Sequence, residues 1–213
     1  MAQMNVNPTR MELTRLKGQL ATAVRGHDLM KDKRDELMRR FMDLIKKNKE
    51  LREKVEVELT EALHSVLLAR AVMSKEMLEE AVMYPTRRMD INIEMVNLMS
   101  VEVPSIQYKE DGSADVSMYP YGFANTSGEL DSAIARLHEI LPDMLELAQV
   151  EKTCQRLADE IERTRRRVNA LEYIMIPQLE ETIRYITMKL DENERSTLTR
   201  LMKVKEMLQE RNL

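Results

Sequence analysis

The stretch that decides the fold runs from residue 13 to residue 55 and reads LTRLKGQLATAVRGHDLMKDKRDELMRRFMDLIKKNKELREKV. Apolar residues recur in it at alternating steps of three and four, which is the spacing of a coiled-coil seam. Because the spacing holds over the whole stretch, it predicts one long helix that packs against a partner along a narrow stripe. The seam positions are Leu13, Leu16, Leu20, Ala23, His27, Met30, Arg34, Leu37, Phe41, Leu44, Asn48, Leu51 and Val55.

A second apolar series, between residues 147 and 208, supplies the partner helix. Two helices that return in one chain run antiparallel, and if the two termini lie together, His27 faces about Glu192. Between residues 171 and 183 the apolar positions are four apart, which predicts that the supercoil of the two helices is locally unwound. Pro177 lies in this part of the chain. The second series is Leu147, Cys154, Leu157, Ile161, Val168, Leu171, Met175, Leu179, Ile183, Ile186, Leu190, Leu201, Val204 and Leu208.

The composition agrees with a coiled coil and excludes several other classes. Charged residues make up 33% of the chain and aromatic residues only 4%, so a thick aromatic core cannot form. The net charge of −4 favours neither nucleic acid nor an anionic membrane surface. A single cysteine, Cys154, excludes an internal disulfide. Residues 1–10 are polar, and no apolar run approaches the roughly 18 residues that span a bilayer. We therefore expect a cytoplasmic protein without direct membrane insertion.

Local signals place the ends of the first helix. Thr9 and Glu12 form a capping box just after Pro8, so the helix should begin there. It should run to about Tyr84, because Pro85 disfavours helix at the residue before it. Between residues 59 and 77 the apolar face widens, which predicts more than one neighbouring element. The first predicted segment is therefore a coiled-coil helix over residues 1–84.

The middle region, residues 85–150, changes character. Alternating apolar and polar residues flank Asp111-Gly112, which predicts a β-hairpin over about residues 100–119. Pro104 fits only an edge strand or a bulge. Residues 89–98 alternate as well and form an ambiguous third strand. The aromatic segment 119–123, YPYGF, should anchor the hairpin to the helices.

A helix resumes after the middle segment. Thr126 or Ser127 can cap it, and Pro142 should break or kink it. Residues 151–213 form the C-terminal coiled-coil helix. The predicted fold class is therefore mainly α: a long antiparallel two-helix coiled coil with a small middle region that contains a β-hairpin and a short helix.

No pattern in the sequence indicates catalysis. The five glycines are scattered without the spacing of a phosphate-binding loop, and the three histidines lie far apart. We therefore expect no catalytic residue, no metal site and no cofactor. His27 in the seam is either a pH-sensitive element or an imidazole bonded to an acid across the seam. The arginines at 163 and 165–167 form either a solvated face or a docking surface, and no interleaved aromatics indicate nucleic acid.

Three blocks of sequence carry a resemblance to a known family. They are PTRMELTRLK at residues 8–17, AVRGHDLMKDKRDEL at 23–37 and TRRRVNALE at 164–172, the last followed by Ile176-Pro177 and Thr182-Ile183. Together they resemble the central-stalk D subunit of V-type and A-type rotary ATPases, and with the hairpin between them the resemblance covers nearly the whole chain. The segment VEVP at 101–104 is similar to a family segment that usually follows a glycine, whereas Ser100 stands here.

The resemblance implies a non-catalytic rotor shaft. In that family the paired termini enter a hexamer of catalytic and regulatory subunits, the A and B subunits, and the shaft couples ATP hydrolysis or synthesis to ion transport through a membrane ring. The implied hexamer contacts are Arg10, Lys17, Gly26, Lys31, Lys33, Arg34, Arg200 and Lys203. The implied contacts with the small F subunit of the stalk are Val101, Val103, Ile106, Val116, Arg165 and Arg166. Another stalk protein links the shaft to the ring, and the choice of H⁺ or Na⁺ and the direction of the machine belong to other subunits.

Two other classes explain part of the pattern. A prefoldin-like chaperone also joins two coiled-coil helices through hairpin strands, and a coiled-coil scaffold explains the heptads alone. Neither accounts for the blocks at the two ends of the chain. Co-purification with ATP-hydrolysing subunits would separate the shaft from both alternatives.

Overall fold

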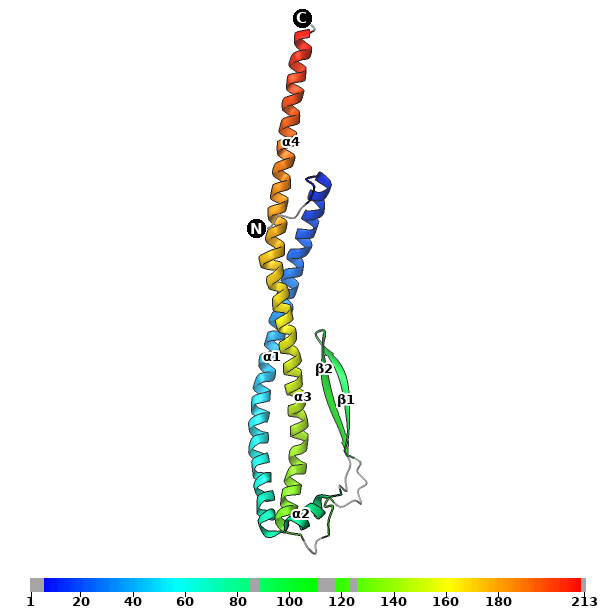
Figure 1. The fold of residues 1–213 in the computed structure, drawn as a ribbon, viewed down its shortest axis with the longest axis vertical. Coiled ribbons are helices and arrows are strands. Elements are labelled where there is room, and N and C mark those ends of the chain that lie inside the picture. Colours follow the sequence, from blue (N-terminus) through cyan, green and yellow to red (C-terminus); the bar gives the residue numbers. More distant parts are fainter. Residues whose placement is uncertain (1–5, 85–88, 111–117, 123–125, 212–213) are drawn as a thin grey trace. The chain divides into compact units, whose positions relative to one another are not determined.

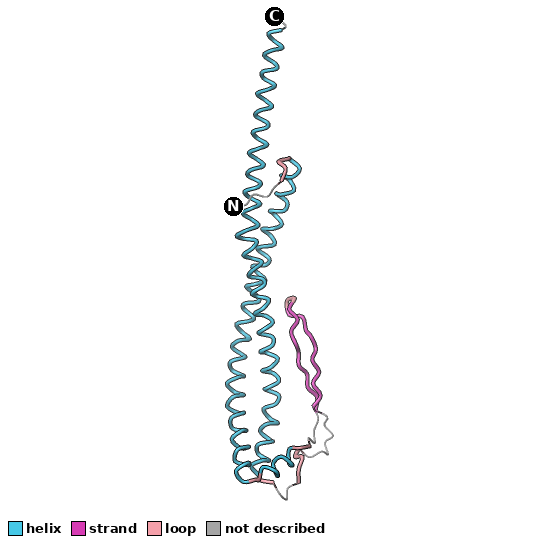
Figure 2. The backbone as a smooth tube through the Cα atoms, viewed as in Figure 1, coloured by secondary structure: helices cyan, strands magenta, loops and turns pink. Residues whose placement is uncertain are grey.

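Figure 1 shows the computed structural model of the chain, which describes residues 6–84, 89–110, 118–122 and 126–211. The predicted fold class is confirmed: long helices dominate, and one two-stranded antiparallel hairpin occupies the middle of the chain. The elements are α1 (Arg10–Val72), α2 (Lys75–Val82), β1 (Met89–Leu98), β2 (Val101–Glu110), α3 (Gly128–Ala170), the π-helical turn η1 (Leu171–Met175) and α4 (Ile176–Arg211). Figure 2 colours the same backbone by secondary structure.

The chain forms two compact units, which are described separately. Unit 1 comprises Met1–Glu36 and Ile161–Leu213, and unit 2 comprises Leu37–Glu160. In both units the coiled-coil pattern of α1 is confirmed, because every predicted seam position from Leu13 to Val55 is buried or half-buried. Leu37, at the start of unit 2, has no exposed surface.

The helices of unit 1 pack through a small aliphatic core. Leu16 of α1 forms a cluster with Leu179 and Ile186 of α4. The predicted start of α1 is confirmed, because the Glu12 backbone N–H donates to the Thr9 hydroxyl at 3.3 Å. This bond satisfies one of the N–H groups that the first turn of a helix leaves without a partner.

The predicted register of unit 1 is wrong. His27 faces Glu172, with Nε2 and Oε2 3.7 Å apart, rather than Glu192. Arg10 at the start of α1 lies 3.7 Å from Glu194, so the start of α1 does not lie beside the end of α4. The error is about 20 residues along the partner helix, or roughly 30 Å. It arose from the assumption that both helices end at the same level, whereas α4 continues for several turns past Glu194.

The helix of unit 1 is locally widened ahead of a proline. The Ile176 N–H donates to the Leu171 carbonyl five residues earlier, which is the bond of a π-helical turn. Pro177 has no N–H to donate, and its ring crowds the carbonyl four residues before it, so an extra residue in the preceding turn relieves the contact. This π-helical turn lies within residues 171–183, where the sequence predicts a local unwinding of the supercoil, but Met175 is exposed and does not belong to the seam.

Two clusters and several ion pairs hold the helices of unit 2. Val55 and Ala62 of α1 pack with Ile140 of α3, and a separate cluster lies around Ala69 and Leu130. Ion pairs between α1 and α3 flank this core. They include Lys47–Glu146 at 2.5 Å, Lys54–Asp143 at 2.7 Å, Arg136–Glu61 at 3.4 Å and Arg52–Glu151 at 3.8 Å.

The first helix ends earlier than predicted. α1 stops at Val72 rather than at Tyr84, and a separate short helix, α2, follows it. Ser74 caps α2, because its hydroxyl accepts a hydrogen bond from the Met77 N–H at 3.4 Å. The break allows Ala81 of α2 to join the buried cluster. No glycine or proline marks this break, so the sequence offered only Ser74 as a signal.

The hairpin also lies at a different place from the predicted one. β2 pairs with β1, the ambiguous third strand of the sequence, and the turn between them is Met99-Ser100. Both turn residues have positive φ, 54° and 69°, as a two-residue hairpin turn requires. The predicted turn at Asp111-Gly112 and most of the predicted strand at 114–119 lie outside the described residues. Pro104 stands on an edge strand, as predicted, because the sheet in the described part of the chain consists of two strands.

The second helix begins as predicted and continues further than predicted. The Glu129 N–H donates to the Ser127 hydroxyl at 3.3 Å, so Ser127 caps α3. Pro142 does not break the helix, since α3 continues to Ala170. Before this helix, the Tyr121 hydroxyl donates to Asp131 at 2.6 Å, and its ring packs on the cluster around Ala69. The described part of the aromatic segment therefore anchors itself to the helices.

Candidate interaction surfaces

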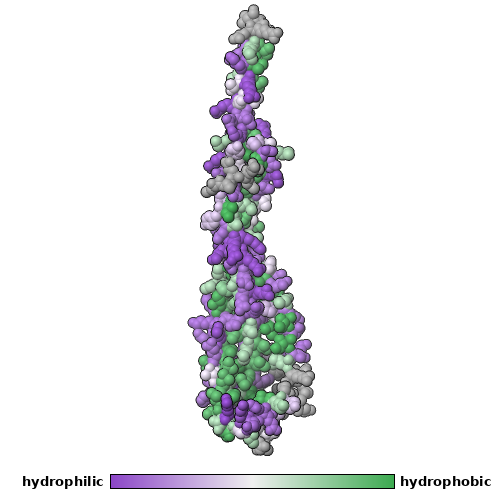
Figure 3. All heavy atoms as spheres, in the orientation of Figure 1, coloured by the Kyte–Doolittle hydropathy of each residue, from purple (hydrophilic) through white to green (hydrophobic). Residues whose placement is uncertain are grey.

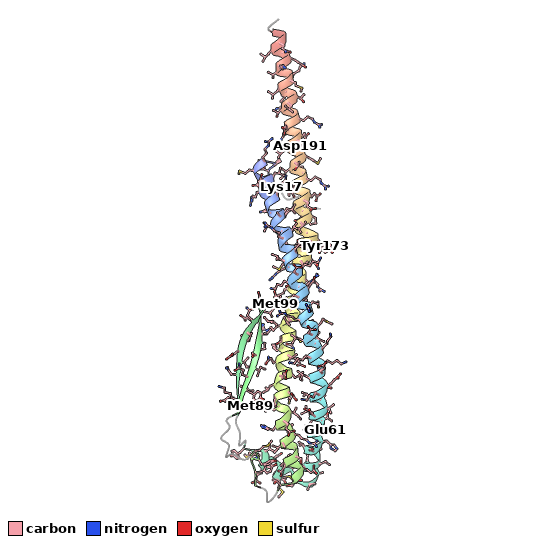
Figure 4. All side chains as sticks on the ribbon, turned by 180° about the vertical axis from the view of Figure 1, so that it is seen from behind. Lys17, Glu61, Met89, Met99, Tyr173 and Asp191 are labelled. Atoms are coloured by element: carbon pink, nitrogen blue, oxygen red, sulfur yellow. The ribbon has the colours of Figure 1, made fainter. Side chains whose placement is uncertain are left out.

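All eight predicted hexamer contacts belong to unit 1. Lys17 and Lys31 project from α1 as exposed side chains, and Figure 4 labels Lys17 on the same unit as Tyr173 and Asp191. Lys33 and Arg34 are half-buried beside the seam. The Arg34 guanidinium donates from Nη2 to Asp35 at 2.7 Å, so this seam cation is neutralised within its own helix. The structure thus gathers these cations on one unit.

Two of the predicted hexamer contacts lie on an unpaired helix end. Residues 191–209 of α4 are exposed throughout, and Arg200 and Lys203 are among them. Large apolar side chains share this end, including Leu201 and Met202, which are 60% and 66% exposed. The predicted seam positions Leu201, Val204 and Leu208 are therefore not packed against α1, because α1 begins at the level of Glu194.

Gly26 lies in the middle of α1, and no close contact within the described chain requires glycine at this position. A methyl group added at its Cα would meet no atom within 4 Å, and its φ is not positive. Glycine in a helix interior costs roughly 1 kcal/mol relative to alanine. Because nothing in the described structure requires glycine here, the open space beside Gly26 suits a close contact from outside the chain. Gly18 has equally open surroundings and is not among the predicted contacts.

The predicted contacts with the F subunit fall into two groups. Val101 and Val103 of β2 are 6% and 8% exposed, so the chain itself covers them. The Ile106 N–H donates to the Gln149 side chain of α3 at 3.0 Å, which fastens β2 to the helix. Arg165 is exposed in unit 1, as is Arg166, which pairs with Glu162. Val116 lies outside the described residues.

The other strand of the hairpin is the apolar surface that sequence reasoning missed. Ile91, Ile93 and Met95 of β1 are 51%, 58% and 60% exposed. Their alternation is visible in the sequence, but it does not reveal which strand faces the helix. The bond from Ile106 to Gln149 decides this question, because it places β2 against α3 and leaves β1 outside.

A further apolar surface lies around α2 in unit 2. A groove of about 540 Å³ is formed by α1, α2 and α3, and its lining includes Val66, Leu78 and Leu130. On α1, Leu67 and Val72 are 60% and 73% exposed. Part of the wide apolar face predicted between residues 59 and 77 is therefore left uncovered by the chain. Figure 3 shows apolar atoms gathered on this unit.

Titratable groups show shifts with plain physical causes. Burial, followed by its hydrogen bond to Asp131, raises the pKa of Tyr121. Burial also raises the pKa of the Cys154 thiol, with a smaller contribution from Glu151, so the thiol is not activated as a nucleophile. The His27 Nδ1–H donates to the Asp28 carboxylate on its own helix at 3.1 Å, and Glu172 across the seam lies beyond hydrogen-bond distance.

These features define a class of protein: a helical coiled-coil protein with exposed apolar and charged surfaces. Among the described residues, no group of His, Cys, Asp and Glu side chains is arranged to hold a metal ion. No helix in the described parts of the chain is long and apolar enough to cross a membrane. The surfaces that the chain offers to partners are an unpaired helix end, an outer strand and an apolar groove.

Comparison with known proteins places this class in a family. The family model for the D subunit of ATP synthase matches residues 12–206. The chain is 62% identical to the V-type ATP synthase D subunit of Clostridium novyi (strain NT), over 98% of this chain and 97% of that protein. It is 63% identical to the proteins of the same name from Clostridium botulinum (strain Langeland / NCTC 10281 / Type F) and Acetivibrio thermocellus (strain ATCC 27405), over 98% and 99% of this chain and 97% and 95% of theirs.

The chain therefore belongs to the family of ATP synthase D subunits. The resemblance drawn from the blocks at residues 8–37 and 164–183 is confirmed. Membership of this family decides against the prefoldin-like chaperone and the generic scaffold, because the match extends over nearly the full length of the chain and of its relatives.

Proposed function

We propose that this chain is the central-stalk rotor shaft of a V-type ATPase, a non-catalytic subunit that couples ATP hydrolysis or synthesis in a catalytic hexamer to ion transport through a membrane ring. Membership of the D-subunit family is the observation that carries the proposal. The shaft would act at the cytoplasmic face of the membrane, where the hexamer and the stalk meet.

Unit 1 supplies the end that enters the hexamer. Its helices carry charged side chains on their outer faces, and exposed ion pairs contribute only about 0–1 kcal/mol each. Contacts of this strength can break and re-form at successive angular positions, which a turning shaft requires. The predicted contacts, from Arg10 to Arg34 and at Arg200 and Lys203, all lie on this unit. The unpaired end of α4 adds apolar side chains, including Leu201, that the A and B subunits of the hexamer would cover.

Unit 2 supplies the contacts with other stalk proteins. The small F subunit would bind at the hairpin, with Val101, Val103 and Ile106 acting mainly by seating the hairpin on α3. The apolar groove around α2 suits the stalk protein that links the shaft to the membrane ring. Apolar contacts of this kind are firm, whereas the charged contacts of unit 1 are exchangeable. This difference suits a shaft that is held tightly through unit 2 and turns against its partners through unit 1.

The test is affinity purification of the full chain from gently solubilised membranes, with ATPase activity measured on the eluate. Recovery of large nucleotide-binding subunits together with ATP hydrolysis supports the proposal. Attachment of a bead to the chain within an immobilised complex then shows whether the chain rotates during hydrolysis. Recovery of the chain with unfolded proteins and no ATPase activity would overturn it.

A variant of the unpaired helix end sharpens the test. Leu201→Gln changes a side chain that is 60% exposed in the chain alone, so the isolated protein should unfold as the wild type does. In the assembled complex the same change should lower ATP-driven ion transport, because it removes apolar surface that the hexamer covers. Equal transport by the variant and the wild type would show that this end does not enter the hexamer.

A further inference from the structure

The outer edge of β1 has unusual properties for a soluble protein. β1 is ten residues long and pairs only with β2, so its other edge has no strand beside it among the described residues. In Figure 1, β2 lies on the side of α3 and β1 lies on the far side. A long apolar strand with a free edge is a template for pairing with another chain, and proteins usually shorten, twist or charge such edges.

The hydrogen-bond pattern of the hairpin shows which groups face outward. In an antiparallel pair, directly opposed residues either exchange both backbone hydrogen bonds or direct them away from each other. Ile106 directs its N–H to Gln149 of α3, so the pair that Ile106 forms with Ile93 is of the second kind. By the same alternation, Ile91 and Met95 also point their N–H and carbonyl groups away from β2.

Pro104 supports this assignment independently. It stands opposite Met95, in the pair whose N–H groups point outward, so its missing N–H removes no bond from the hairpin ladder. The chain therefore uses a proline at one of the alternate positions in β2 whose N–H groups lie outside the ladder. A proline placed at the equivalent positions of β1 should be tolerated for the same reason.

The side chains of β1 give the two faces of the free edge different chemical character. The residues with outward N–H groups carry the exposed apolar side chains Ile91, Ile93 and Met95 on one face. The opposite face carries the carboxylates of Asp90 and Glu94, both exposed, and Glu94 accepts a hydrogen bond from Asn92 at 3.2 Å. One face of the edge is thus apolar and the other acidic.

We propose that the outer edge of β1 is a strand-addition site for a partner segment that alternates apolar and basic residues. The partner's backbone bonds the outward groups of Ile91, Ile93 and Met95, its apolar side chains cover theirs, and its basic side chains face Asp90 and Glu94. A second copy of this chain lacks the basic side chains that the acidic face calls for. Two β1 edges paired antiparallel around Asn92 would set Asp90 opposite Glu94, and like charges directly opposed are destabilising, while pairing around Ile93 would leave both carboxylates without a basic partner.

The test measures binding of a labelled peptide, acetyl-Lys-Val-Lys-Val-Lys-Val-Lys-amide, to the full chain by fluorescence anisotropy. Two control peptides have Glu in place of Lys, or the same residues in blocked order. The variants are Ile93→Pro, which removes one outward N–H, and Ile93→Ala, which keeps it. Ile91→Pro repeats the comparison at a second outward position. Far-ultraviolet circular dichroism and sizing chromatography check that each variant keeps the fold and state of the wild type.

The expected result separates backbone pairing from side-chain contact. Ile93→Pro should bind the Lys-Val peptide about three- to tenfold more weakly than Ile93→Ala, the range for one net hydrogen bond. The Glu-Val and blocked peptides should bind more weakly than the alternating Lys-Val peptide. Equal binding by the Pro and Ala variants, absence of binding, or binding of the Glu-Val peptide with equal affinity would each overturn the proposal. Dimers of the wild-type chain that Ile93→Pro dissociates would overturn it in favour of a second copy.

Strand addition at β1 goes beyond the proposed function, because it concerns how the hairpin engages a partner and does not depend on rotation. The peptide test uses only the chain and a synthetic probe. Its failure would therefore leave the recovery of ATPase subunits untouched, and the failure of that recovery would leave the peptide result standing.

Discussion

Substitution of Gly26 by alanine should have opposite effects on the isolated chain and on the assembled complex. In the chain alone the added methyl group meets no atom within 4 Å, so no clash offsets the gain in helix propensity. That gain is roughly 1 kcal/mol for a helix interior. For a chain of this size it corresponds to a rise in Tm of about 2–4 °C. In the complex, the methyl group would occupy the space that we assign to one of the hexamer's subunits.

Gly18→Ala is the matched control, because Gly18 lies in the same helix and its surroundings are equally open. Thermal unfolding followed by circular dichroism should show the same rise in Tm for both variants. ATP-driven ion transport by the reconstituted complex should fall for Gly26→Ala and remain unchanged for Gly18→Ala. If Gly26→Ala lowered the Tm of the isolated chain, the open space beside Gly26 would be refuted. If both variants supported normal transport, Gly26 would not face a partner.

Four further variants test separate features of the molecule. Leu37→Ala should cost about 2–5 kcal/mol of unfolding free energy in urea denaturation, because Leu37 has no exposed surface; a loss below about 1 kcal/mol would contradict its place in the seam. The raised pKa of Tyr121 means that its contribution to stability is complete below the unfolded pKa of about 10 and is lost as pH rises through the folded value. Tyr121→Phe should therefore flatten the loss of Tm at alkaline pH, and an unchanged alkaline slope would argue against this assignment. Val103→Asp should release the F subunit on a sizing column, because a charge in a site 8% exposed unseats the hairpin, so retention of the F subunit would count against it. Lys33→Glu should reduce the coupling of ATP hydrolysis to ion transport only modestly, since the charged contacts between the shaft and the hexamer are individually weak; complete uncoupling in the transport assay would show that one contact dominates.

Features that depend on one helix could be predicted from the sequence. The seam from Leu13 to Val55, the Thr9 cap and the Ser127 cap are each encoded by residues within a few turns of one another, and the structure confirms them. The break predicted at Pro142 is wrong, because α3 continues through it, whereas a kink at this residue stays a prediction. Ile140, two residues earlier, is 2% exposed in a core with Val55, and this packing favours a continuous helix.

The position of the hairpin could not be predicted from turn propensity. Asp111-Gly112 is the stronger hairpin signal, whereas the observed turn uses Met99-Ser100, two residues that rarely adopt positive φ. The Ser100 N–H compensates by donating to the Asn97 side chain at 2.8 Å. The burial of Val101 and Val103 immediately after the turn also favours this register. Tertiary contacts thus stabilise a turn whose own residues disfavour it, and the same contacts decide which strand becomes the outer edge.

The predicted register of the two helices is wrong because a coiled-coil seam repeats along its length. A heptad seam repeats, so sliding one helix by whole heptads still sets apolar residues against apolar residues. The error of about 20 residues is close to three heptads, which is why the predicted seam was right while its partner was wrong. Ion pairs distinguish between these alternative alignments. Lys54 with Asp143 in unit 2 and Arg10 with Glu194 in unit 1 each join a cation of α1 to an acid that only one alignment brings opposite. Exposed pairs add little free energy individually. Their value is selective, since an alignment slipped by three heptads loses them while it keeps the apolar seam.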